Sequence, residues 1–189
     1  MTEGTGGLAG RPAAIVLSRA DLRRITGFAA ASAAEVLAVF EAGRPGDRRP
    51  REALDAAWEF AGGGERGKAL RDTASGAMRA AKEAEGPGGR DAAWAAVSAA
   101  GAAYLHPLPK ATQVKHILGA GAHAARAVEL AEGGDPRVGA SHLEGVLRLA
   151  TPGVVDVLRR YPEAPGGGGR VGELIRSLDT ALRALAPGP

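Results

Sequence analysis

The residues of this chain best suited to catalysis or ligand binding are four histidines and a nearby glutamine. The chain contains His106, His116, His123 and His142, and Gln113 lies three residues before His116. An imidazole exchanges protons near neutral pH and can bind ligands, so neighbouring histidines point to acid–base chemistry or to a binding site. What they could do therefore depends on their spacing.

His116 and His123 are seven residues apart, which places them two turns apart on one face of a helix. Gln113 shares this face, which is separate from the main apolar face of the segment. We predict a polar pocket formed by Gln113, His116 and His123, with His106 above it, that holds a small ligand. The alternative is that both histidines form hydrogen bonds inside a helix interface. Because the spacing separates the two rings by roughly 10 Å along the axis, we predict no metal site and no cofactor.

The sequence contains no motif that defines an enzyme. The glycine-rich segment 165–169 precedes a predicted helix, as phosphate-binding loops do, but the Lys-Ser/Thr pair and the preceding strand of such loops are missing. Neither a His-Glu-x-x-His nor a Gly-x-Ser-x-Gly motif occurs. Acidic pairs such as Glu129 and Glu132 are predicted to lie on solvated faces of their helices. Catalytic residues are therefore not assigned.

The elements that must position these residues are predicted to be helices. Alanine dominates the apolar residues and aromatic residues make up only 4%, a composition that favours helices over strands. Apolar periodicity and capping signals predict about eight helices, over residues 18–43, 47–61, 65–85, 91–104, 110–132, 136–150, 154–161 and 171–185. The predicted fold class is all-α, with the helices packed as antiparallel hairpins.

The chain is predicted to form one domain. Residues 1–17 are expected to be a flexible tail, and residues 18–189 a single helical domain with a glycine-rich link at 165–169 before the last helix. Ser18 is the predicted N-cap of the first helix. Trp58 and Met78 are assigned to the buried stripes of their helices.

A short sequence repeat indicates that one helical hairpin is used twice. The string Asp55-Ala-Ala-Trp58 recurs as Asp91-Ala-Ala-Trp94, and each copy is predicted to open a helix that is followed by a longer alanine-rich helix. Stacked hairpins of this kind bury a continuous core. The alternative is a chance recurrence in an alanine-rich chain.

Charge and composition limit the compartment and the partners. The net charge is +3, with 24 basic and 21 acidic residues well mixed along the chain, so we do not expect a nucleic-acid partner. The absence of cysteine excludes disulfides and a cysteine nucleophile. With no predicted membrane span or signal peptide, we expect a cytoplasmic protein without a membrane partner. The abundance of Ala, Gly, Arg and Pro is typical of a high-GC, actinobacterial genome.

The most specific pattern lies around residue 50. A helix ending in Phe40-Glu41 leads through PGDRRPR into the alanine-rich helix EALDAAWEFA, and HPLPKATQVKH and VVDVLRRYP follow later. This pattern resembles the immunity protein family of bacterial polymorphic-toxin systems, the immunity type five-like group. Actinobacterial relatives often carry an exonuclease-subunit label, which no ATPase motif in this chain supports. The residues that carry the family signature are Asp47, Arg49, Pro50, Arg51, Glu52 and Trp58.

The resemblance implies a helical protein that binds and neutralises a partner protein, either a toxin or a pathway protein, and it implies no catalytic residue. Because proteins that mask basic nucleases are commonly acidic, the net charge of +3 argues against a basic nuclease as the partner. The alternative function is a small-molecule-binding enzyme, or an accessory or resistance protein of secondary metabolism, that uses the pocket of Gln113, His116 and His123. A neighbouring toxin gene would favour the first function, and a biosynthetic gene cluster the second.

Overall fold

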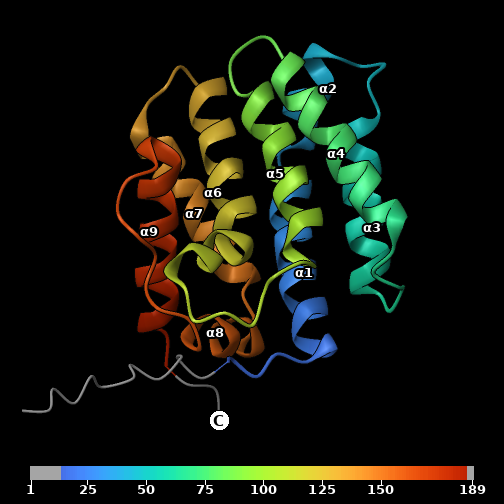
Figure 1. Cartoon of the computed structure of the whole chain (residues 1–189). Coiled ribbons are helices and arrows are strands. Elements are labelled where there is room, and N and C mark those ends of the chain that lie inside the picture. The colour runs from blue at the N-terminus through green and yellow to red at the C-terminus, as the bar shows by residue number, and fades with distance from the viewer. Residues whose placement is uncertain (1–13, 187–189) are drawn as a thin grey trace, which may run out of the picture.

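A computed structural model describes residues 14–186, and every regular element in that range is helical (Figure 1). The nine α-helices of this range are α1 (Arg19–Ala34), α2 (Leu37–Gly43), α3 (Arg49–Ala61), α4 (Lys68–Glu83), α5 (Gly89–Ala102), α6 (Val114–Ala131), α7 (Pro136–Leu149), α8 (Pro152–Arg159) and α9 (Gly169–Ala184). One 3-10 turn, Ala111–Gln113, precedes α6. The all-α prediction is confirmed. Most of the tail predicted over residues 1–17 lies outside the described residues.

The first helix begins at the predicted cap but ends early. The hydroxyl of Ser18 accepts a hydrogen bond from the backbone amide of Asp21 at 3.0 Å, and the Asp21 carboxylate accepts one from the Ser18 amide at 3.0 Å. The prediction of one helix over 18–43 is wrong, because the chain breaks between α1 and α2 and bends there by 45°. Leu37 and Phe40 of α2 are both buried, so this short helix has its own contacts with the core.

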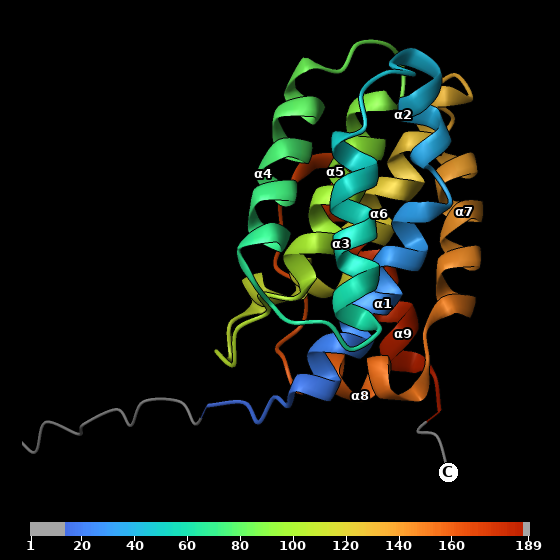
Figure 2. The same cartoon turned by 90° about the vertical axis from the view of Figure 1, so that its right-hand side faces the viewer.

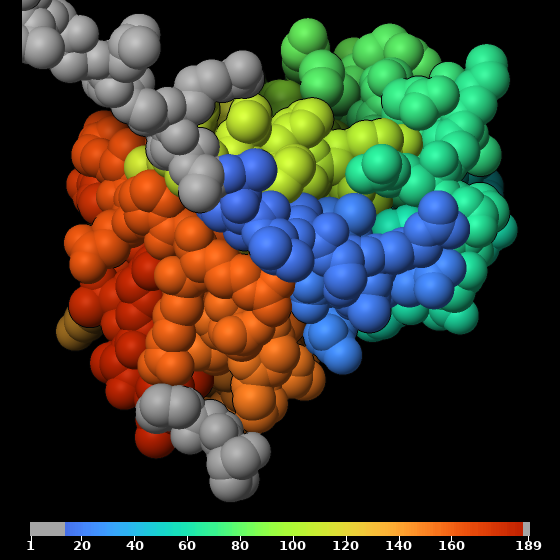
Figure 3. All heavy atoms as spheres, turned by 60° about the horizontal axis from the view of Figure 1, so that its bottom comes forward, coloured from blue at the N-terminus to red at the C-terminus, as the bar shows by residue number. Residues whose placement is uncertain are grey.

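The long helices run alternately up and down, and consecutive pairs pack as antiparallel hairpins (Figures 1 and 2). α3 packs on α4, α5 on both α4 and α6, and α7 and α9 both pack on α6. α8 lies at one end of the bundle beside the start of α1 (Figure 3). None of the described helices is by itself long and apolar enough to cross a bilayer, although the bent pair of α1 and α2 passes that test together.

The core is built mainly from alanine. α5 lies between α1, α4 and α6 and buries alanines along most of its length. Small side chains let the helix backbones approach closely. At Gly121 of α6 an added Cβ atom would lie 2.7 Å from a methyl group of Val146 in α7, so the bundle has no room for a larger residue there.

The exposure of three side chains differs from the prediction. Trp58 is 44% exposed and Phe60 is buried in its place, while Met78 is 37% exposed. Alanine stripes give a helix a broad, weakly defined apolar face, so spacing alone does not show which large residue lies at its edge. Glu129, predicted to be solvated, is only 1% exposed because residues distant in the sequence cover it.

The two copies of the Asp-Ala-Ala-Trp string do not occupy equivalent places. The first copy lies in the middle of α3, whereas the second begins in the first turn of α5. The prediction that each copy opens a helix therefore holds only for the second one. This difference in position gives Trp58 and Trp94 different surroundings.

Candidate functional site

His116 and His123 line the same groove. It lies between α4, α5, α6 and the first turns of α9, and its volume is about 550 Å³. Trp94 of α5, Met78 of α4 and Ile175 of α9 form apolar parts of its walls. A mainly apolar lining with a few polar groups, at this volume, is typical of sites that bind small molecules.

His123 is held in place by two residues of α5. Its Nδ1 atom lies 2.8 Å from Oδ1 of Asp91, and its ring stacks on Trp94 with 6.0 Å between centroids and 21° between ring planes. Asp91 and Trp94 are three residues apart and so face the same neighbouring helix. In a neutral His123 ring this contact keeps the proton on Nδ1 and leaves Nε2 as a hydrogen-bond acceptor. The interactions orient one polar group at the groove.

His116 has a less polar environment. Burial lowers the pKa of its imidazole, and the nearby charges of Lys115 and His106 lower it further, while a hydrogen bond with the backbone of Gly101 acts in the opposite direction. Because the pKa lies below the usual value of 6.5, His116 is mainly neutral at pH 7. The groove therefore contains a neutral imidazole close to the charged amine of Lys115.

The structure places the other two predicted pocket residues outside the groove. Gln113 is buried, and its side-chain oxygen accepts a hydrogen bond from the backbone amide of His106 at 3.0 Å. The hydroxyl of Tyr161 donates to the backbone carbonyl of His106 at 2.8 Å, while the His106 side chain is exposed. Gln113 thus fastens the segment before α6. His142 lies apart, 3.3 Å from Glu35, and no three potential metal ligands are grouped anywhere in residues 14–186.

The signature residues around position 50 form ion pairs between neighbouring elements. The Asp47 carboxylate accepts hydrogen bonds from the Arg49 side chain at 2.6 and 2.8 Å and from its backbone amide at 3.2 Å. The same guanidinium lies 2.6 Å from Glu83 at the end of α4. Arg51 pairs with Glu41 of α2 at 2.7 Å. These contacts connect the loop before α3 to α2 and α4, which is a structural role.

The remaining signature residues differ in their surroundings. Pro50 is buried in the first turn of α3, where its missing amide is not needed. Glu52 is exposed, and Trp58 lines a second, shallower hollow on the surface. Of the six signature residues, Trp58 is therefore the one that offers a large apolar surface to a partner.

Replacing Arg49 with glutamine is expected to lower the melting temperature at pH 7 by about 1–4 °C. The hydrogen bonds from Arg49 lower the pKa of both Asp47 and Glu83 in the folded protein. These two ion pairs therefore stabilise the protein fully at pH values above the pKa of the carboxylates in the unfolded chain, which is near 4. The stabilisation is lost as the pH falls through the lower pKa values of the folded protein. Thermal unfolding between pH 7 and pH 3 should show the difference from wild type shrinking towards the acid end.

Arg48 offers a matched control for that variant. It is exposed and forms no ion pair with any residue of the described range, so Arg48→Gln should change the melting temperature little at any pH. A pH-independent loss of stability in Arg49→Gln would contradict the ion-pair explanation.

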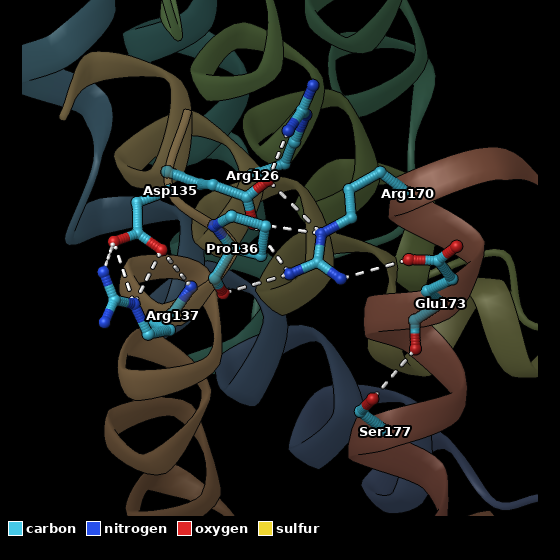
Figure 4. A network of polar contacts seen from close by, with 8 residues as sticks. Arg126, Asp135, Pro136, Arg137, Arg170, Glu173 and Ser177 are labelled. Atoms are coloured by element: carbon cyan, nitrogen blue, oxygen red, sulfur yellow. Dashed lines mark hydrogen bonds and ion pairs between the residues drawn. The ribbon is translucent and has the colours of Figure 1, made fainter. Parts of the chain in front are cut away.

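Glu129 is the buried centre of a charge cluster whose arginines are partly exposed. Its partners Arg126 and Arg170 are labelled in Figure 4. Its carboxylate pairs with Arg126 one turn away in α6 and accepts hydrogen bonds from Arg170 of α9 at 2.9 and 3.0 Å. Arg170 also donates to the backbone carbonyl of Pro136, at 3.1 Å, and to Glu173. The cluster joins α6, α7 and α9, and so it fixes the helix that forms one wall of the groove.

The fold and these sites define a helical-bundle protein with a sheltered groove between its helices. The model of a protein family described as "Imm-5 like putative immunity protein" matches residues 16–147, which extend from just before α1 into α7. The chain belongs to this family, as the pattern around residue 50 indicated. No curated protein and no solved structure matches the chain. The match includes the groove walls from α4, α5 and α6, whereas α8 and α9 lie outside it.

Proposed function

We propose that this protein binds a toxin polypeptide and thereby neutralises it. The observation that carries the proposal is membership of an immunity protein family over residues 16–147. Neutralisation by binding needs a surface whose residues contribute strongly to the free energy of association.

Trp58 is our candidate for the centre of that surface. It is 44% exposed and lines a hollow of about 470 Å³ together with Arg23 and Leu149. Trp and Arg are the residue types that most often dominate binding energy. The Arg23 guanidinium donates to the backbone carbonyl of Gly63 and lies 5.9 Å from the centre of the Phe60 ring, so it is already ordered before a partner binds.

The charge of the hollow indicates what kind of partner fits. Arg23 and Arg24 both line it, and no acidic residue of the described range does. Together with the net charge of +3, this favours a partner surface that is neutral or acidic.

Replacing Trp58 with alanine is expected to weaken the complex about 30-fold, which corresponds to about 2 kcal/mol of binding free energy. The side chain is half in solvent, so folding should be retained. The measurement is calorimetric titration with the toxin polypeptide that the wild-type protein captures from its host, together with protection of cells that express that toxin. Leu108→Ala is the matched control, since Leu108 is equally exposed but does not line the hollow.

These measurements test toxin neutralisation and the role of the Trp58 hollow separately. A wild-type protein that captures no toxin polypeptide from its host and protects no cells would refute toxin neutralisation. Binding that is reduced equally by Trp58→Ala and Leu108→Ala would leave neutralisation standing and reject the hollow as its site.

A further inference from the structure

We propose that the groove between α4, α5, α6 and α9 is a binding site for a small molecule with an apolar body and one anionic group. Its volume of about 550 Å³ falls within the range of small-molecule sites. It shares no lining residue with the hollow around Trp58. The proposal therefore stands apart from toxin binding, and either can fail alone.

The apolar side chains give the groove a surface for a hydrophobic body. Trp94, Val97, Val171 and Ile175 line it from α5 and α9, and Met78 lines it from α4, where it is 37% exposed. An exposed methionine beside a tryptophan adapts to varied apolar shapes. Val97 is buried, whereas Trp94, Val171 and Ile175 remain partly exposed, as they would not be in a closed helix interface.

The charged groups of the groove favour an anion. Lys115 is the one charged residue among the described lining residues, and no carboxylate faces the groove from that set. Asp91, which contacts His123 of the groove, is engaged with that histidine. Lys115 forms no ion pair with any residue in the range 14–186, so its amine is available to a ligand. An anion there would also lie beside the imidazole of His116.

The length of the groove sets the size of the ligand. His116 and His123 are two turns apart on α6, or roughly 10 Å along the axis. An anionic group at Lys115 would leave room for a chain of about this length running past Trp94. At Gly101, which also lines the groove, an added Cβ atom would meet no other atom within 4 Å, so the space there is open.

Octanoate is a suitable probe, and octanol is its uncharged counterpart of equal length. The chain has two tryptophans, so in the full-length Trp58→Phe protein the tryptophan fluorescence, excited selectively over that of tyrosine, comes from Trp94 alone. Titration with octanoate should give a saturable change of this fluorescence, with an affinity roughly fivefold higher than that of octanol.

Two variants in the Trp58→Phe background locate the binding. Lys115→Gln should lower octanoate affinity roughly fivefold and leave octanol affinity unchanged, whereas Lys110→Gln, outside the groove, should alter neither. Gly101→Leu places a side chain in the open space and should lower the affinity for both probes by about tenfold. The far-ultraviolet circular dichroism and the melting temperature of each variant show that the fold is retained.

The proposal is overturned if octanoate causes no saturable change, or if octanol binds as tightly as octanoate. Octanoate binding that is unaffected by both Lys115→Gln and Gly101→Leu also overturns it, because the site would then lie elsewhere. Tighter binding of octanoate that depends on both residues supports it.

Discussion

Replacing Arg170 with methionine is expected to lower the free energy of unfolding by about 3 kcal/mol. Methionine keeps the apolar stem but removes the hydrogen bonds to Glu129, whose side chain is 1% exposed. The carboxylate then keeps only Arg126, and a buried charge with too few partners is costly. Urea unfolding followed by circular dichroism measures the change.

Arg176 provides the matched control in the same helix. Its guanidinium donates to the backbone carbonyls of Pro165 and Gly167, and its removal leaves no buried charge. Arg176→Met should therefore cost less than about 1 kcal/mol. The double variant Glu129→Gln/Arg170→Met should be more stable than Arg170→Met, because the neutral amide needs no cation. A double variant that is less stable than Arg170→Met would show that the charge of Glu129 is not the cause.

Gly139→Ala is expected to lower the free energy of unfolding by about 2 kcal/mol. A Cβ atom at this position of α7 would lie 2.3 Å from Oε2 of Glu129 and 3.3 Å from its Cβ. The carboxylate cannot move away easily because Arg126 and Arg170 hold it from α6 and α9. Chemical denaturation measures the loss.

The same helix contains a glycine without this constraint. The nearest atom to a Cβ added at Gly145 is Nη2 of Arg148, at 3.8 Å. Gly145→Ala should therefore stabilise the protein by about 0.5–1 kcal/mol, the usual gain when alanine replaces a helical glycine. Similar effects of Gly139→Ala and Gly145→Ala would mean that the contact with Glu129 does not limit position 139.

Local signals predicted the helices well because capping and propensity act over a few residues. Ser18 and Asp135 accept hydrogen bonds from the backbone amides of their first turns, as expected of N-caps. The helix predicted to begin at residue 47 begins at Arg49 instead, and the side chain of Arg48, at the N-cap position, forms no capping hydrogen bond. The Asp47 carboxylate, just before the helix, accepts hydrogen bonds from both the backbone amide and the guanidinium of Arg49.

Long-range contacts were beyond the reach of the same signals. The spacing of His116 and His123 predicts that they share a face, and both line the groove. Their partners come from other helices, so the contacts of His123 with Asp91 and Trp94 depend on how α5 aligns with α6. The second Asp-Ala-Ala-Trp string was visible in the sequence, but its spacing alone did not show a histidine opposite it.

The burial of Glu129 illustrates the same limit. Its partner Arg170 lies 41 residues further along the chain, beyond the glycine-rich link. Neither residue differs in its local sequence from a solvated charge on a helix. Only the packing of α9 against α6 and α7 brings the partly exposed Arg170 onto the buried carboxylate of Glu129.

The groove has walls of two origins. The helices that hold Trp94 and His123 belong to the part of the chain that the family shares, whereas Val171 and Ile175 come from a helix beyond it. The buried leucines of α9 and Arg170 hold this helix on the bundle, and Val171 and Ile175 are partly buried residues that also pack against the core. Substitutions between apolar residues at positions 171 and 175 would therefore change the shape of the groove, while Trp94 and His123 stay unchanged on the opposite walls.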